Sequence, residues 1–549
     1  KCNVSKLLIL IMARKGSRDS ISRQNLRLVK DKPLIHYVLQ SSLQFHQADV
    51  FVSTDSEEIA EYSLMNGAQV IHRPKYLTKN STSVKEICYH ALKHLKKKGI
   101  TYEKCLVLHP KFPLIEQKTL KKFFRYLKDD IQTVFGITQI VNPKLNYTAK
   151  INSNSLLELK PLNKNSALLN RIVSFKTENF LKQKGKFVGP YHGLHLSDNE
   201  LYSLSRYHDF KIFEQILDRK RILIRIDATI EIGLGHVYNM LTILNHLRNE
   251  EILIVMNKNK TIGSNKFKEY LYNVKFFSND SQLNKIISNF KPNIIFNDIL
   301  NTSQSYMSKL KQFNLMIVNF EDLGIGRKHA DLVFNPIFSQ KKPLTKEFYG
   351  GNYACVRDEF RIWSNDIFRK DVKKILISFG GTDPVKITSK VLESINTDSL
   401  KEIEFTVILG YGFQHKNDIK AKSASLKKNG FKIKLIEKSD FLAKYLRDTD
   451  FAIISNGRTV FEVACMAVPV LSVSVNEREK SHSFVKDNNI GTHMVFSKNT
   501  FSKNLSVNIQ HMLKSENRKK YKSNLKKLEL LNGVERVIKI INDEYIKKL

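Results

Sequence analysis

The stretch RILIRIDATIEIGLGHVYNMLTIL, residues 221–244, decides how the middle of this chain folds. Its first residues have the apolar run of a buried strand, and we expect a helix to follow. Gly233 and Gly235 lie between the two and permit close backbone approaches. His236 then falls at the start of the helix, where free N–H groups favour an anion. Asp227 just upstream and a second glycine turn, at Gly380 and Gly381, favour a functional site over an ordinary turn with an incidental histidine.

A similar strand opens the chain, in KLLILIMARKGSRDSISRQNLRLV at residues 6–29. Short apolar runs then alternate with amphipathic stretches up to about residue 215, and the pattern restarts at DRKRILIRID and again at VKKILISFGG. Alternating strands and helices predict mostly parallel sheets covered by helices. We therefore expect an α/β protein with domains at residues 1–216, 217–369 and 370–549, the last ending in a lysine-rich helical tail.

Length and composition agree with about three globular domains, since the chain has 549 residues of which 42% are hydrophobic. The net charge is 90 − 53 = +37. The lysines are spread along the whole chain, and no Lys/Arg stripe carries interleaved aromatic residues. We therefore expect no nucleic-acid partner, but a preference for anionic small molecules such as nucleotides.

The cysteines and the first apolar run bear on location. The five cysteines form no CxxC pair and no zinc spacing, which suits a reducing compartment. The run LLILIMA is too short to span a bilayer and lacks a cleavage site. We expect a cytoplasmic protein without an integral membrane segment.

Two further strand-to-helix turns follow the logic of the first. In ILISFGGTDPVKIT, Gly380 and Gly381 let the backbone approach a ligand, and Asp383 either binds it or caps the next helix. In FAIISNGRTVFEVACMAVPVL, the strand meets Asn456 and Gly457. Thr459 offers a hydroxyl, and Glu462 follows one helical turn later, where a carboxylate can bind ribose hydroxyls.

Residues from about 221 to 530 resemble the UDP-sugar hydrolase of pseudaminic acid biosynthesis, a relative of the MurG-like glycosyltransferases with the GT-B fold. The matching stretches occur in the family's order: RIDATIEIGLGHV, FEDLGIGRKHADLVFNP, YGGNYACVRDEF, SFGGTDP and SNGRTVFEVACMAVP. The resemblance implies hydrolysis of a UDP-linked diacetamido-trideoxy sugar to free sugar and UDP. It also implies a pair of Rossmann-like domains and no cofactor for this half.

The resemblance assigns roles to individual residues. The family's general base is the histidine of its G-x-G-H motif, here His236, which activates water; a neutral imidazole suits that role near pH 7. We place Asp227 beside it as a second catalytic residue. The implied UDP-binding residues are Gly233, Gly235, Gly380, Gly381, Asp383, Asn456, Gly457, Thr459 and Glu462.

The chain departs from this family at three places. Asn239 stands where the family has arginine, Arg458 stands inside the phosphate turn, and NEREKSHSF replaces the usual Asn-Gln after the last strand. These changes leave the particular sugar open.

The first 215 residues resemble the cytidylyltransferases that make CMP-sialic acid and its relatives, which have a Rossmann-like, GT-A-like fold. ARKGSRDSISRQNLR, VSTDSEEIAEYSLMNGAQVIHRPKYL and LHPKFPL match family signatures. The resemblance implies CTP as a substrate and allows a homo-oligomer through this domain. The implied CTP-binding residues are Arg14, Gly16, Ser17, Asn25 and Arg73.

The metal site of this domain is weakened. The family holds Mg²⁺ with paired aspartates. Its I-D-I-D-x-x-x-D-F aligns with YSLSRYHDF, so Ser203 and Ser205 replace two aspartates and Asp209 alone remains as a metal ligand. Gln24 and His109 replace two further family residues. An active enzyme and a retained fold without catalysis are both open.

The sequence thus predicts a fused sugar enzyme of nonulosonic acid biosynthesis. The alternative is a nucleotide-sugar glycosyltransferase with a non-catalytic nucleotide-binding N-terminal domain. A hydrolase needs a small closed site for water, whereas a transferase needs a groove for an acceptor beside the histidine.

Overall fold

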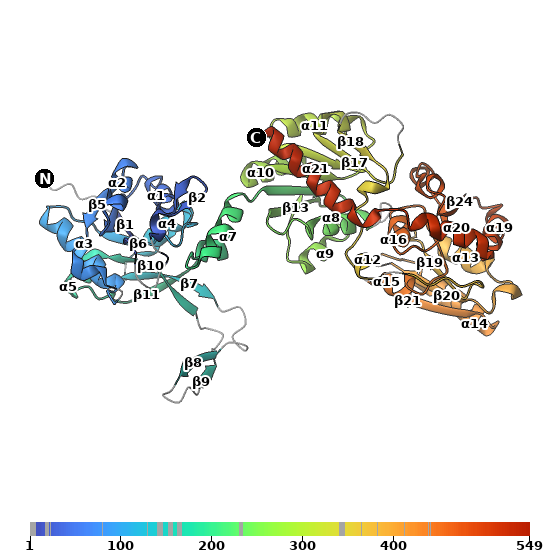
Figure 1. Cartoon of the computed structure of the whole chain (residues 1–549), viewed down its shortest axis with the longest axis horizontal. Coiled ribbons are helices and arrows are strands. Elements are labelled where there is room, and N and C mark those ends of the chain that lie inside the picture. Colours follow the sequence, from blue (N-terminus) through green and yellow to red (C-terminus); the bar gives the residue numbers. More distant parts are fainter. Residues whose placement is uncertain are drawn as a thin grey trace. The chain divides into compact units, whose positions relative to one another are not determined.

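The structure is a computed structural model. It describes residues 7–16, 21, 23–79, 81–128, 130–139, 147–151, 157–161, 167–229, 234–339, 346–363, 365–380, 383–410, 412–437, 439 and 441–549; at 139, 147–151, 157–161 and 167–170 it gives the backbone alone. Ser17, Gly233 and Gly381 lie outside the described residues. The chain divides into two compact units, Lys1–Asp218 and Arg219–Leu549 (Figure 1).

The first unit contains a seven-stranded sheet with the order β11-β7-β10-β6-β1-β4-β5. The strands β1, β4, β5 and β6 run parallel, and β10 is antiparallel to both of its neighbours. The strands are β1 (Leu7–Met12), β4 (Asp49–Thr54), β5 (Gln69–His72), β6 (Lys104–Leu108), β7 (Thr133–Gln139), β10 (Ala167–Lys176) and β11 (Tyr191–His195).

Two separate apolar cores cover the two faces of this sheet, because successive residues of β1 point to opposite sides. The helices are α1 (Leu34–Leu43), α2 (Glu57–Met65), α3 (Val84–Lys97), α4 (Gln117–Tyr126), α5 (Thr177–Lys182), α6 (Asp198–Leu201) and α7 (Tyr207–Leu217). Two small antiparallel pairs complete the unit: β2 (Leu28–Val29) with β3 (Lys32–Pro33), and β8 (Tyr147–Ile151) with β9 (Leu157–Pro161).

The second unit begins with a seven-stranded parallel sheet of order β14-β13-β12-β15-β16-β17-β18. The strands are β12 (Arg221–Ile226), β13 (Glu251–Asn257), β14 (Asn273–Phe277), β15 (Ile294–Asp298), β16 (Met316–Phe320), β17 (Leu332–Asn335) and β18 (Glu347–Tyr349). The helices α8 (Gly235–Leu244), α9 (Ser264–Glu269), α10 (Asp280–Phe290), α11 (Gln304–Lys311) and α12 (Glu359–Ile362) accompany it. The strand order reverses between β12 and β15, and ligands of such sheets bind at that switch point.

A six-stranded parallel sheet of order β21-β20-β19-β22-β23-β24 forms the other half of this unit. Its strands are β19 (Lys374–Ser378), β20 (Glu404–Leu409), β21 (Lys432–Glu437), β22 (Phe451–Ser455), β23 (Val470–Ser474) and β24 (Gly491–Val495). Its helices are α13 (Ile387–Ser394), α14 (Lys416–Lys428), α15 (Ala443–Leu446), α16 (Thr459–Cys465), α17 (Glu477–Lys480), α18 (Phe484–Asp487), α19 (Phe501–Leu513) and α20 (Ser515–Leu525). The switch point lies between β19 and β22. The predicted α/β class and the pair of Rossmann-like halves are confirmed.

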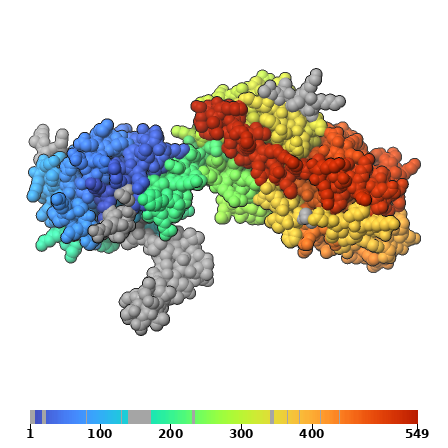
Figure 2. Space-filling model, in the orientation of Figure 1, coloured from blue at the N-terminus to red at the C-terminus, as the bar shows by residue number. Residues whose placement is uncertain are grey.

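The last helix, α21 (Gly533–Lys548), returns to the first half of the unit. Its apolar residues Val534, Val537 and Ile541 are buried in the same core as β12 and α8. Gly533 lies so close to the Ala354 carbonyl that a Cβ would meet it at 1.9 Å. The helical tail expected in the last domain therefore packs on the preceding one, and its red surface covers part of the second unit in Figure 2.

None of the described helices is long and apolar enough to cross a membrane.

Candidate active site

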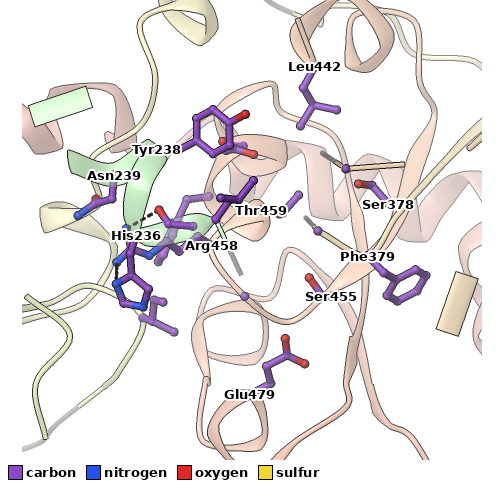
Figure 3. A pocket seen from close by; sticks show the side chains of 18 of the residues that line it. His236, Tyr238, Asn239, Ser378, Phe379, Leu442, Ser455, Arg458, Thr459 and Glu479 are labelled. Atoms are coloured by element: carbon purple, nitrogen blue, oxygen red, sulfur yellow. Dashed lines mark hydrogen bonds between the residues drawn. The ribbon is translucent and has the colours of Figure 1, made fainter. Parts of the chain in front are cut away.

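A cavity of about 280 Å³ lies between the two halves of the second unit. One wall carries residues of α8, and the other carries the turns after β19 and β22 (Figure 3). These are the carboxyl ends of strands at both switch points, so the cavity lies where the sheet topology of each half predicts a ligand.

His236 forms a buried pair with a carboxylate at the wall of this cavity. Its side chain is buried, and its Nδ1 contacts Oδ1 of Asp298, the buried last residue of β15. Because a carboxylate accepts hydrogen bonds, Nδ1 carries the proton in this pair. Nε2 is buried without a hydrogen-bond partner among the described residues. The geometry is that of a histidine base that a carboxylate holds in one tautomer.

Arg458 joins the other half of the unit to this pair. Its Nη1 donates to the Gly235 carbonyl at 3.1 Å, and its Nη2 lies 3.4 Å from Nδ1 of His236 and 3.6 Å from Oδ1 of Asp298. A Cβ at Gly235 would stand 3.3 Å from Cδ of Arg458, so the glycine makes room for the arginine. Asn239 Nδ2 also donates to Asp298, at 3.4 Å.

Glu321 neutralises the arginine charges. The Nε of Arg458 lies 2.8 Å from one carboxylate oxygen of Glu321, and Arg478 pairs with the other. Burial would raise the pKa of Glu321, but the two guanidinium groups, with His236 nearby, hold that pKa at about 2. The pKa of Arg458 is raised by the same pairing, despite its burial. The contact between the two halves therefore joins an ionised carboxylate from the first half to two guanidinium groups from the second.

The cavity brings together most of the described residues predicted to bind UDP. Its lining includes Gly235, His236, Gly380, Asp383, Gly457, Thr459 and Glu462. Gly380 has a φ of +76°, which favours glycine. Gly233 and Gly381 lie outside the described residues.

Two predicted residues do not line the cavity. Asp227 is buried, and its Oδ2 pairs with Lys260 at 2.9 Å. Asn456 is also buried; its amide donates to the carbonyls of Glu479 and His482, each at 2.9 Å. Asn456 therefore fixes the loop after β23, because its donors are already used within the protein.

Two lining carboxylates already have protein partners. Asp383 accepts from the backbone N–H groups of Ile387 and Thr388 at 2.8 and 2.9 Å, so it caps α13, the alternative left open by the sequence. Glu462 pairs with Arg357 at 3.0 Å between Oε1 and Nε. A ribose hydroxyl at Glu462 would share the carboxylate with that arginine.

Sequence reasoning missed four residues that shape the site: Asp298, Glu321, Arg478 and His482. Asp298 ends the apolar run IIFND, and an acid that ends a buried parallel strand is a detectable signal. Glu321 directly follows β16 in the same way. The other two lie in NEREKSHSF, which matched no motif, so nothing in the local pattern assigned them a place.

In the first unit, hydrogen bonds within the protein hold the predicted CTP loop. Asn25 Nδ2 donates to the Arg14 carbonyl at 2.8 Å, and Gly16 has a φ of +144°. The Lys15 N–H donates to Oδ1 of Asp55 at 2.8 Å. Arg73 is buried and donates to the Ser53 carbonyl at 2.8 Å. This loop carries the right residue types for a triphosphate, and Ser17 lies outside the described residues.

Asp209 does not fit a Mg²⁺ site. One of its oxygens accepts from the N–H groups of Ser205 and Arg206, both at 2.7 Å, and the other lies 3.2 Å from Nε2 of His208. Asp209 therefore caps the start of α7. Ser203 and Ser205, 3.4 Å apart between their Oγ atoms, supply no carboxylate. Across the described residues, no three histidine, cysteine, aspartate or glutamate side chains are placed to hold a metal ion.

Different known proteins resemble different parts of this chain. Residues 8–199 match the family described as Cytidylyltransferase. Pseudaminic acid cytidylyltransferase of Campylobacter jejuni is 30% identical over 141 residues, which are 25% of this chain and 60% of that protein.

Two relatives align over longer stretches. The uncharacterized protein MJ1062 of Methanocaldococcus jannaschii is 29% identical over 47% of this chain, and the chain spans 57% of its length. The spore coat polysaccharide biosynthesis protein SpsG of Bacillus subtilis is 25% identical over 46% of this chain and 77% of its own length. An alignment of that extent is longer than the first unit, so it reaches into the second. Residues 8–199 of this chain thus match the Cytidylyltransferase family model, and the second unit shares sequence similarity with a protein of polysaccharide biosynthesis.

Proposed function

We propose that the second unit hydrolyses a UDP-linked amino sugar to free sugar and UDP, with His236 as the general base. One observation carries the proposal: Asp298 holds Nδ1 of a buried histidine that lines the cavity, and Nε2 of that histidine has no partner among the described residues. A base needs a free lone pair at the place where a water can stand.

In the proposed reaction His236 acts as the base and Asp298 stabilises its protonated form. Nε2 of His236 takes a proton from a water molecule while the water oxygen attacks the anomeric carbon. The bond from that carbon to the UDP oxygen breaks, and its electron pair leaves with UDP. Asp298 stabilises the imidazolium that forms, because its carboxylate is buried beside Nδ1. The proton then passes to solvent, which restores the neutral imidazole.

The cavity also has the cationic groups that a diphosphate requires. Arg357, Arg458 and Arg478 line it, and guanidinium groups match phosphate oxygens in pairs. Apolar side chains from three segments of the half with the six-stranded sheet also line the cavity: Phe379, Leu409 and Leu442. A uracil ring suits these apolar side chains, which leaves the sugar toward His236.

For the first unit we propose binding of CTP through the loop that Arg14 and Asn25 shape. The family match and the similarity to the Campylobacter jejuni pseudaminic acid cytidylyltransferase support this substrate. Transfer of CMP to a pseudaminic-acid-like sugar would place both units in one route to an activated sugar. We route no step through Mg²⁺, because Asp209 is occupied as a helix cap.

The test is a mass-spectrometric assay of the full chain. UDP-2,4-diacetamido-2,4,6-trideoxyhexoses are supplied without any acceptor, and we expect UDP and free sugar. His236→Asn keeps an amide near the position of Nδ1 and removes Nε2. It should lower UDP release by about 10³-fold, within the range for general bases, while UDP affinity stays within about two-fold. Intact UDP-sugar with the wild type refutes hydrolysis; turnover that appears only with an added acceptor would instead identify a glycosyltransferase.

A second tube tests the first unit. The chain receives CTP, MgCl₂ and, in turn, pseudaminic, legionaminic and N-acetylneuraminic acids. Formation of a CMP-sugar supports the transferase proposal. Binding of CTP by calorimetry without any CMP-sugar identifies a nucleotide-binding domain that has lost its chemistry.

A further inference from the structure

A second histidine of the cavity, His482, has no role in the reaction proposed above. It lies between α17 and α18, in the stretch that matches no family motif, and it lines the cavity. Its side chain is only 5% exposed. The ring of Phe338 packs against it edge-on at 5.2 Å between ring centroids. Buried polar atoms normally have hydrogen-bond partners, so both ring nitrogens of His482 are expected to have one.

The protein fixes the tautomer of His482. Nδ1 lies 2.5 Å from the carbonyl oxygen of Asn456, which only accepts, so Nδ1 carries the proton. Nε2 is then an acceptor, and it is buried without a partner among the described residues. Burial lowers the pKa of His482 to about 4, so the ring is neutral at physiological pH. Its Nε2 therefore offers a lone pair that no protein group in the described structure uses.

His482 shares this arrangement with His236. In both, Nδ1 is held by a protein acceptor and Nε2 is buried and unpartnered. Glu321 links the surroundings of the two rings: it pairs with Arg458, whose Nη2 lies 3.4 Å from Nδ1 of His236, and with Arg478, which lies four residues before His482. Both histidines line the cavity, so we place the glycosyl group of the proposed reaction beside them.

An unpaired buried acceptor costs free energy, and a ligand that donates to it removes the cost. We infer that Nε2 of His482 binds the glycosyl group of the nucleotide sugar by accepting a hydrogen bond from one of its hydroxyl or acylamino N–H groups. The inference rests on the proposed function for the identity of the ligand. It makes His482 a specificity-determining residue, because a sugar without a donor at that position leaves the acceptor unpaired.

Two variants separate the two nitrogens of the ring. His482→Asn places an amide near the position of Nδ1, so a donor to the Asn456 carbonyl is kept while the Nε2 acceptor is lost. His482→Gln can return an amide oxygen near the place of Nε2. Calorimetry of the full chain measures the affinity for UDP and for a UDP-2,4-diacetamido-2,4,6-trideoxyhexose, and Trp363 fluorescence in urea reports whether the second unit is folded.

We expect His482→Asn to weaken binding of the UDP-sugar about five-fold, which corresponds to one neutral hydrogen bond. UDP affinity and the urea midpoint should change little, and His482→Gln should regain part of the loss. Unchanged affinity for the UDP-sugar in His482→Asn overturns the inference. Equal losses for UDP and UDP-sugar also overturn it, because they indicate a structural role.

The same experiment distinguishes failure of the proposed function. Wild-type protein that binds the UDP-sugar more tightly than UDP but releases no UDP refutes the hydrolase and leaves His482 as a sugar contact. Wild-type protein that binds neither compound refutes both.

Discussion

Asp298→Asn is the sharpest test of the proposed base. The carboxylate of Asp298 is fully buried and contacts Nδ1 of His236. Its Oδ1 also lies 3.6 Å from Nη2 of Arg458. The asparagine has nearly the same shape, so the substitution removes the charge and leaves the packing.

The magnitude follows from the charge that appears on His236 as it takes the proton. At about 4 Å and an effective dielectric constant of about 20, an imidazolium and a carboxylate attract by about 4 kcal/mol. Loss of that attraction slows the chemical step about 10³-fold. Arg458 adds to the loss, because its guanidinium, 3.4 Å from Nδ1, would then repel the imidazolium with less opposition. Binding of UDP should change less than about three-fold.

The assay measures single-turnover release of UDP at saturating protein, so that affinity does not enter. Asp227→Asn is the matched control, because this carboxylate follows the neighbouring strand β12 but pairs with Lys260 and does not line the cavity. We expect less than a ten-fold loss from the control. If Asp298→Asn keeps more than a tenth of wild-type turnover, or if both variants lose equally, the dyad argument is wrong.

Two further predictions concern the charged contact between the halves of the second unit. In both experiments, fluorescence of Trp363, the single tryptophan of the sequence, measures unfolding of that unit. Arg458→Ser leaves the buried Glu321 with Arg478 alone, so it should lower the free energy of unfolding by about 3 kcal/mol. Urea unfolding measures this as a lower midpoint. An unchanged midpoint would show that the pairing of Arg458 with Glu321 does not stabilise the protein. The pKa of Glu321 lies below its ordinary value, so its contribution is complete above about pH 4.5 and is lost as pH falls toward about 2. By pH 3 the wild type should have lost about 2 kcal/mol more than Glu321→Gln, relative to pH 7, and parallel losses would refute this.

Much of the fold could be read from the sequence because its strands are buried on both faces. The run LLILIM is apolar throughout, and FAIIS is apolar up to its last residue, Ser455, as expected for parallel strands covered by helices. A glycine-containing turn lies at each of the two switch points, so the sequence also predicted the region in which the cavity lies. The position of α21 did not follow, because its stripe of Val534, Val537 and Ile541 suits any apolar face.

The partners of the site residues were harder to predict than the residues themselves. His236 was identified from its turn, but Asp298 lies 62 residues away and reaches it only because β12 and β15 are neighbours. Asp227 was favoured by its nearness in sequence, and Lys260 takes its carboxylate instead. Proximity along the chain is thus a weak guide where parallel strands bring distant carboxyl ends together.

The charges around the cavity constrain how a nucleotide can bind. Arg458 and Arg478 are balanced by Glu321 and Asp298, and Arg357 pairs with Glu462. The described lining therefore holds no cation without a carboxylate beside it, whereas a nucleoside diphosphate brings two to three negative charges. One arginine has to exchange a carboxylate for phosphate when UDP binds. Arg458 also holds the Gly235 carbonyl, while the side chain of Arg478 is more exposed, at 33% against 19%. Arg478 is thus the arginine that can turn to the diphosphate while the contact between the halves and His236 stays in place.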